Sequence, residues 1–133
     1  MTTVFLVTVG LIALWNDSDQ WHPPAQRAYA ELRKARAELV TTRFVLLECG
    51  NTVARTDLRA EVIRLRVQLA RRNRLINPSE EDWNQACAAF DRGKPGDAGL
   101  VDLVSFAVMQ RLGIQQALTN DRHFSAAGFE TLF

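Results

Sequence analysis

The chain has 133 residues, enough for one domain that buries on the order of two-thirds of its unfolded surface. Hydrophobic residues make up 47% and charged residues 23%, as in ordinary globular proteins, and the net charge of +1 excludes a strong overall field toward nucleic acid or membranes. The two cysteines, Cys49 and Cys87, make neither a disulfide framework nor a zinc site and are typical of a reducing compartment.

The most apolar segment, residues 4–15, reads VFLVTVGLIALW. It is shorter than the ~20 apolar residues that a membrane span needs, and no Lys or Arg precedes it as in a signal peptide. We therefore expect a cytoplasmic protein with no membrane attachment. The unbroken apolar run at residues 4–7 predicts a central parallel strand covered on both faces, followed by a turn at residues 8–10 and a short helix from residue 11.

The rest of the chain alternates helical patterns with short apolar strands. Helices are predicted over residues 25–38, 44–54, 57–72, 80–91, 100–112 and 121–126. Strands are predicted over residues 39–41, 75–77, 116–119 and 129–132. This alternation predicts one α/β/α domain over residues 1–133, a three-layer fold with a central parallel sheet of four to five strands.

Several helix ends carry capping signals. Thr56 is the expected N-cap of the helix over residues 57–72, in which leucine and valine recur at three- and four-residue spacing. Ser79 and Asp82 resemble a capping box. Gly113 is expected to end the helix over residues 100–112.

Three carboxylates lie where a structural residue would be apolar: Glu48, Asp102 and Asp121. Each has a local explanation, because Glu48 could pair with Arg43 or Arg55, Asp102 could face its helix dipole, and Asp121 could cap a short helix. Together they favour a site, since Asp121 follows a strand, Asp102 begins the helix leading to that strand, and ligands of open α/β sheets bind at the carboxyl edge. Clustered carboxylates repel one another unless a cation neutralises them, and oxygen ligands suit Mg²⁺ or Mn²⁺.

Four further residues are weaker candidates. Asp97, in a Gly-rich loop, is either a metal ligand or a turn residue. Thr8, Asn51 and His123 are candidate substrate contacts, with a plain surface role as the alternative for His123. The Gly-rich loop lacks the spacing of a phosphate-binding loop, and no nucleophilic triad is visible.

The stretches VFLVTVGLIALWNDSDQWH, TTRFVLLECGNTVAR and DAGLVDLVSFAVMQRLGIQQALTNDRHFSAAGF resemble a PIN domain of the kind found as the ribonuclease toxin in VapBC toxin–antitoxin pairs. The resemblance implies that Glu48, Asp102 and Asp121 are the catalytic, metal-binding acids. It implies cleavage of RNA phosphodiesters by a water that Mg²⁺ or Mn²⁺ activates. It also implies a homodimer and a small antitoxin whose helix or tail lies across the active-site groove.

One position departs from the family pattern. An acid followed by Thr or Ser is expected at the end of the first strand, and this chain has Val7 followed by Thr8. We interpret Val7 as the replacement of an active-site aspartate, by mutation or by selection against toxicity, and we expect an enzyme that is close to inactive. The alternative is a naturally non-catalytic PIN-like protein that only pairs with an antitoxin.

Two further alternatives stay open. A receiver-type domain also gathers carboxylates at a sheet edge, but the helical positions of Glu48 and Asp102 argue against it. The segment 55–74 carries seven arginines against Asp57 and Glu61. It is therefore a solvated helix face, a contact for the RNA backbone, or a surface for an acidic or amphipathic antitoxin segment.

Overall fold

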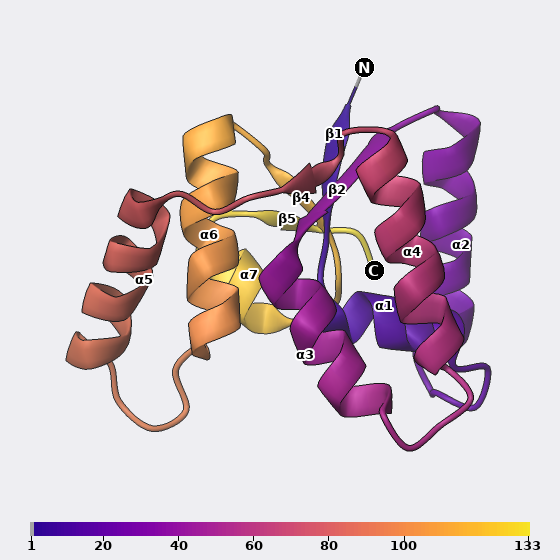
Figure 1. The fold of residues 1–133 in the computed structure, drawn as a ribbon, viewed down its shortest axis with the longest axis horizontal. Helices are drawn as coiled ribbons and strands as arrows, with labels where there is room; N and C mark the ends of the chain where they lie inside the picture. The colour runs from indigo at the N-terminus through magenta and orange to yellow at the C-terminus, as the bar shows by residue number, and fades with distance from the viewer. Residues whose placement is uncertain (1) are drawn as a thin grey trace.

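The computed structural model describes residues 2–133, which form a three-layer α/β/α domain (Figure 1). The five strands are β1 (Thr3–Leu6), β2 (Glu38–Thr42), β3 (Leu75–Ile76), β4 (Gln116–Leu118) and β5 (Glu130–Thr131). The seven helices are α1 (Thr8–Trp15), α2 (His22–Lys34), α3 (Arg43–Val53), α4 (Arg59–Arg71), α5 (Glu80–Arg92), α6 (Leu100–Leu112) and α7 (Arg122–Ala126). The predicted fold class is confirmed. None of the helices in the described part of the chain is long and apolar enough to cross a membrane.

All strand pairings are parallel, and the sheet order is β3-β2-β1-β4-β5. In chain order, β2 and β3 therefore extend the sheet on one side of β1, and β4 and β5 then extend it on the other side. Figure 1 shows α2 and α4 on one side of the sheet and α5 and α6 on the other. Strand order reverses between β1 and β4, which is where open parallel sheets form their binding crevice.

The central strand confirms the prediction made from its unbroken apolar run. Val4, Phe5, Leu6 and Val7 are each at most 2% exposed, because helices cover both faces of the sheet. The predicted turn at residues 8–10 is wrong. The chain passes directly from β1 into α1, with Val7 as the N-cap residue and Thr8 as the first helical residue.

Gly10 lies inside α1 for a steric reason and does not mark a turn. A Cβ atom at this position would lie 1.8 Å from the carbonyl oxygen of Leu118 at the end of β4. Only glycine lets the helix backbone approach the strand so closely. This contact places the start of α1 beside the end of β4, at the carboxyl edge of the sheet.

Two other predicted boundaries shift, one because of strand pairing and one because of a local hydrogen bond. Helix α2 ends at Lys34, and Glu38 belongs to β2, paired with Thr3. Thr56 is not an N-cap, because α4 starts at Arg59 and the Thr56 hydroxyl instead accepts a bond from the Leu58 N–H inside the preceding turn.

Two predicted helix ends are confirmed. Ser79 and Asp82 form the predicted capping box of α5. The Asp82 carboxylate, 2% exposed, also accepts bidentate hydrogen bonds from Arg111 of α6, and so it ties the two helices together. Gly113 ends α6 in the left-handed conformation.

Candidate functional site

The carboxyl ends of β1 and β4 define the candidate site. Val7 follows β1, and Asp121 lies three residues beyond the end of β4. Helix α3 begins directly after β2 and carries Glu48 in its middle, while α6 carries Asp102 in its first turn. The parallel sheet thus brings four positions that are far apart in the sequence to one edge.

A cavity of about 430 Å³ connects three of these positions. Its walls include Val7, Glu48 and Asp102, together with Thr8 and Asp19. Asp19, in the loop between α1 and α2, was not recognised from the sequence, because a loop aspartate in NDSD looks like an ordinary turn residue. Its carboxylate does accept the Trp21 N–H at 2.8 Å, as such a turn requires.

Position 7 is an apolar part of the wall of this cavity. Val7 is 2% exposed, has extended backbone angles (φ −117°, ψ 149°) and makes no side-chain bond to the start of α1. N-cap positions favour residues whose side-chain oxygen accepts an N–H of the first turn. Valine therefore gives the start of α1 no side-chain hydrogen-bond acceptor. It also gives the cavity no oxygen ligand at this point.

Glu48 is held by the residue next to Val7. The Thr8 hydroxyl donates a hydrogen bond of 2.5 Å to Glu48 Oε1, which links the first turn of α1 to the middle of α3. This contact replaces the expected pairing of Glu48 with Arg43 or Arg55, neither of which makes a salt bridge to it within residues 2–133. Thr8 thus serves to position Glu48 in this structure.

Asp102 has the most perturbed carboxyl group of the site. Burial, and then the nearby negative charges of Asp121 and Glu48, raise its pKa to about 6, against a small opposing effect of His123. Because both other acids act on Asp102, the three carboxylates predicted from the sequence share one electrostatic environment. The structure brings these three together.

This environment makes the stability of the protein depend on pH. The raised pKa of Asp102 means that the folded chain holds a proton that the unfolded chain releases between about pH 4 and 6. The stability from this group is therefore present at low pH and is lost as pH rises to about 6. At pH 7 we expect Asp102→Asn to increase the free energy of unfolding by roughly 1–2 kcal/mol, after a discount for solvent screening.

Denaturant unfolding of the two proteins from pH 4 to 7 checks this prediction. The difference in unfolding free energy between Asp102→Asn and the parent chain should increase across that range. Asp57→Asn removes an exposed carboxylate on the α3–α4 loop. Its unfolding free energy should stay close to that of the parent chain at every pH. A constant difference for Asp102→Asn would contradict the prediction.

Asp121 caps α7 and is tied to His123. Its Oδ1 accepts the backbone N–H of His123 at 2.9 Å and lies 3.0 Å from His123 Nδ1, while His123 Nε2 lies 3.0 Å from the carbonyl oxygen of Gly96. Carboxylate and carbonyl oxygens are both acceptors, so both ring nitrogens donate when both bonds are made. The Gly96 carbonyl and the Asp121 carboxylate accordingly raise the pKa of His123.

The weaker candidates divide. Asp97 is exposed and its carboxylate accepts the Lys94 N–H at 2.9 Å, as expected of a turn residue. Asn51 is exposed on α3 and lines a different, apolar cavity beside Glu48. Thr8 and His123 each contact one of the predicted acids and so belong to the site.

The carboxylates of the site are candidate ligands for a divalent metal ion. Carboxylate oxygens are the ligands that Mg²⁺ and Mn²⁺ prefer. Within residues 2–133, however, no group of three or more His, Cys, Asp and Glu side chains is arranged so that it could hold a metal ion. The acids converge without forming a closed ligand set, and the side chain at the centre of the edge is the apolar Val7.

Comparisons with known proteins show the family of the chain. The PIN domain family matches residues 4–130. The protein named 23S rRNA-specific endonuclease VapC20, from two strains of Mycobacterium tuberculosis, is 32% identical over 127 residues, which cover 95% of each chain. The crystal structure of Mycobacterium tuberculosis VapC20, described as a Sarcin-Ricin loop cleaving toxin, superposes with a TM-score of 0.77 at 29% identity and covers 95% of both chains.

Proposed function

Because the chain belongs to the PIN-domain family and is VapC-like over nearly its whole length, we propose that it is an endoribonuclease toxin whose metal site is disabled by Val7. The proposed substrate is RNA, and ribosomal RNA is the first RNA to test, because the relative is named for 23S rRNA. RNA and an antitoxin as partners also imply a cytoplasmic protein.

One observation carries this proposal. The cavity at the strand-order reversal is walled by Glu48, Asp102 and the valine at the end of β1. The two acids, with Asp121 beside them, are the oxygen ligands that a Mg²⁺- or Mn²⁺-dependent hydrolase needs, and position 7 is where the remaining ligand is expected. The reversal Val7→Asp tests the proposal directly: metal-dependent RNA cleavage should appear.

A non-catalytic protein that pairs with an antitoxin is the second candidate function. The burial of Val7 favours this second candidate. The Val7 side chain is 2% exposed and packed in the core, as expected if the surrounding residues have adapted to a valine at this position. The two candidates differ in the outcome for Val7→Asp, because an adapted binding protein stays inert when the acid is introduced.

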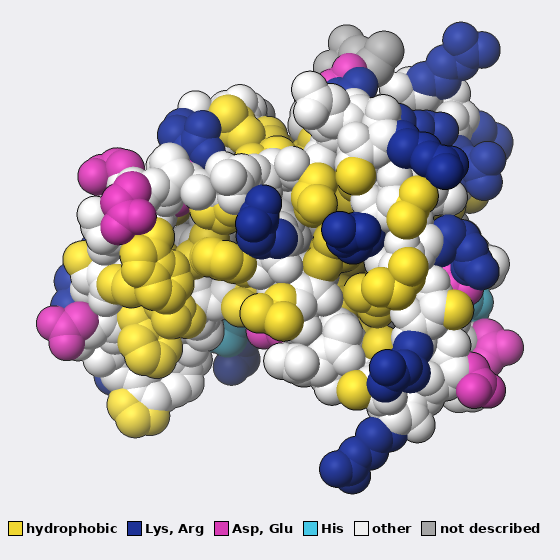
Figure 2. Space-filling view, in the orientation of Figure 1, with side chains coloured by type: hydrophobic (Ala, Val, Ile, Leu, Met, Phe, Trp, Pro, Cys, Tyr) yellow, Lys and Arg dark blue, Asp and Glu magenta, His cyan; other side chains and the backbone are white. Residues whose placement is uncertain are grey.

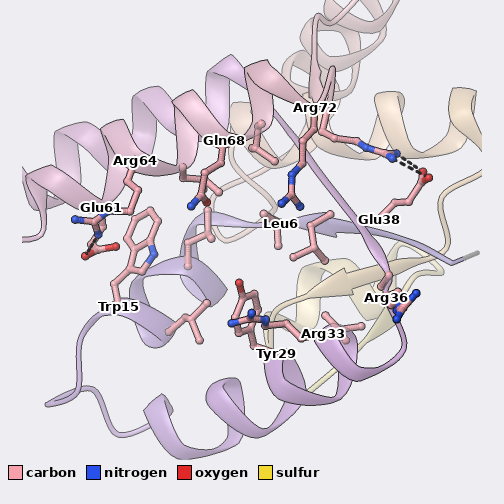
Figure 3. A pocket seen from close by; sticks show the side chains of 18 residues that line it. Leu6, Trp15, Tyr29, Arg33, Arg36, Glu38, Glu61, Arg64, Gln68 and Arg72 are labelled. Carbon is pink, nitrogen blue, oxygen red and sulfur yellow. Dashed lines mark hydrogen bonds and ion pairs between the residues drawn. The ribbon is translucent and has the colours of Figure 1, made fainter.

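The proposed antitoxin site is an arginine-lined trough between α2 and α4. This cavity of about 680 Å³ has an apolar floor that includes Leu6, Leu14 and Leu65. Figure 3 shows Arg72, which directly follows α4, and Arg33 of α2 on opposite sides of the trough. Tyr29 lies beside Arg33, and Trp15 lies near Arg64.

The charges of the trough support a partner with acidic residues. Glu61 and Glu38 are already paired with Arg64 and Arg74. Arg33, Arg36 and Arg72 form no salt bridge with any described residue and remain exposed. Cations around an apolar floor fit an amphipathic helix that carries acidic residues beside an apolar stripe. This favours the antitoxin interpretation of the arginine-rich segment over the RNA interpretation.

Adjacent arginines at the end of α4 provide a matched test of this choice, because Arg71 is the last residue of the helix and Arg72 follows it. Arg72 lines the trough, and Arg71 is exposed outside it. We expect Arg72→Glu to weaken capture of the antitoxin encoded beside this chain by about tenfold or more, and Arg71→Glu to change it little. Calorimetric titration of both variants checks this. If the segment bound RNA, both charge reversals would weaken RNA binding alike and reduce its salt dependence.

The proposed homodimer has a candidate surface on α3 and α5. Leu47, Trp83 and Phe90 are 64%, 38% and 55% exposed, and Figure 2 shows the hydrophobic patch over α5 extending toward α3. Phe44 packs edge-on against Trp83 beneath it, with ring centroids 6.0 Å apart. Exposed apolar side chains beside an apolar cavity of about 540 Å³ suit a self-complementary contact.

Light scattering tests this surface. We expect the mass of two chains in solution and the mass of one chain for Leu47→Asp, because a buried, unpaired carboxylate opposes association. Ile63→Asp replaces a similarly exposed side chain on α4 and should leave the mass unchanged. A single-chain mass for the parent protein would reject the dimer.

A further inference from the structure

Among residues 2–133, His123 is the side chain whose hydrogen bonds join an acid of the site to the loop between α5 and α6. Its Nδ1 lies 3.0 Å from Asp121 Oδ1, and its Nε2 lies 3.0 Å from the carbonyl oxygen of Gly96. The two partners are 25 residues apart in the chain, and no backbone hydrogen bond within the described residues joins the loop over residues 93–99 to α7.

We propose that His123 is a positioning residue of the nuclease site, which fixes the Asp121 carboxylate through one ring nitrogen and holds the loop over residues 93–99 at the rim of the site through the other. The proposal rests on the proposed function for its consequence in catalysis. The two contacts themselves do not depend on it.

The Asp121 contact selects an orientation of the carboxylate. Oδ1 receives two hydrogen bonds, from the N–H of His123 and from its ring, and Oδ2 receives none from the described residues. The Asp121 N–H is itself anchored to the Thr119 hydroxyl at 3.0 Å. With Oδ1 occupied, Oδ2 is the oxygen that remains for chemistry at the site. Such supporting contacts typically change ligand affinity or activity by 10–100-fold when removed.

The Gly96 contact acts on the loop. Gly96 has φ +96°, which few other residues adopt, and Lys94 and Asp97 close the turn around it. The loop is exposed along residues 92–97, so little apolar packing holds it. A single side-chain bond from His123 is therefore a large part of what fixes the position of this loop.

Two substitutions separate the contacts. Asparagine places its amide nitrogen near the position of Nδ1 and can still donate to Asp121, while glutamine reaches near the position of Nε2 and can still donate to Gly96. In the parent chain, hydrogen exchange of residues 93–99 should accelerate by about tenfold in His123→Asn and His123→Ala, and stay near the parent rate in His123→Gln. This arm requires no nuclease activity.

The catalytic arm uses the Val7→Asp background. We expect His123→Gln to lower kcat by about tenfold or more with little change in KM, because Asp121 loses its orientation. His123→Asn should keep kcat and raise KM, because only the loop is released. Unchanged exchange in His123→Ala overturns the proposal whatever the activity. If kcat falls equally in both variants, in step with their unfolding temperatures, the proposal is also overturned. His123 would then have a purely structural role.

If Val7→Asp is inactive while the exchange pattern appears as expected, the proposed function fails and the positioning contacts stand. The two failures are therefore distinguishable.

Discussion

Replacing Val7 by aspartate is expected to turn an inert chain into a metal-dependent ribonuclease. Cleavage of RNA in the presence of Mn²⁺ or Mg²⁺ should rise by about 100-fold or more over the parent chain, the scale on which single electrostatic groups of active sites act. The reason is the position of Val7, at the end of the central strand and in the wall that also holds Glu48 and Asp102. Expression of the variant without antitoxin should arrest growth.

The same substitution has a signature that does not depend on catalysis. A carboxylate at the N-cap of α1 can accept an N–H of the first turn, which is worth about 0.5–2 kcal/mol, but it is also a new buried charge beside two acids. The variant without metal should therefore gain little stability. With Mn²⁺ at about 100 times its dissociation constant, the free energy of unfolding should rise by about 2.7 kcal/mol, and the parent chain should respond much less.

Val7→Asn is the matched control for this experiment. Asparagine caps helices as well as aspartate does, but it carries no charge and is a weak ligand for a divalent cation. It should match or exceed Val7→Asp in metal-free stability and remain inactive. A folded Val7→Asp protein that neither responds to Mn²⁺ nor cleaves RNA would reject the disabled-nuclease proposal and leave the non-catalytic binding protein.

Gly10→Ala is expected to cause the largest loss of stability of any glycine-to-alanine change in this chain. The new Cβ would lie 1.8 Å from the Leu118 carbonyl oxygen and 2.8 Å from its carbonyl carbon, which are backbone atoms of the central sheet. They cannot move aside as a flexible side chain can, so α1 must shift. We expect a loss of about 3 kcal/mol or more, at the upper end of the cost of overpacking, measured by denaturant unfolding.

Gly50→Ala provides the matched control. Gly50 also lies inside a helix, α3, but no atom outside the helix lies within 4 Å of the position of its Cβ. Alanine should therefore stabilise the protein by about 0.5–1 kcal/mol through helix propensity alone. If the two substitutions change the free energy of unfolding in opposite directions, the contact of α1 with β4 is the cause of the loss. A mild effect of Gly10→Ala would instead show that α1 is free to move.

Much of the fold follows from local signals in the sequence. The apolar run before Val7, the capping residues Ser79 and Asp82, and the terminal Gly113 act through neighbours a few residues away, and the structure confirms each of them. Two of the boundaries that were predicted wrongly, at residues 8–10 and at Glu38, depend on distant partners. Thr8 and Gly10 look like a turn in the sequence, but they are helical in the structure. The end of β4 lies so close to α1 that only a residue without a Cβ fits at position 10.

The site divides in the same way. The sequence by itself indicated that Glu48, Asp102 and Asp121 are out of place as structural residues, because burying a carboxylate is costly enough to be visible in a single chain. The resemblance of the sequence to the PIN family indicated that position 7 lacks an expected acid. Only the tertiary structure decided that these positions share one edge and that Thr8 holds Glu48. It also placed Asp19 in the wall and His123 between Asp121 and Gly96. Strand order sets these neighbours, and strand order depends on contacts between segments that no local pattern records.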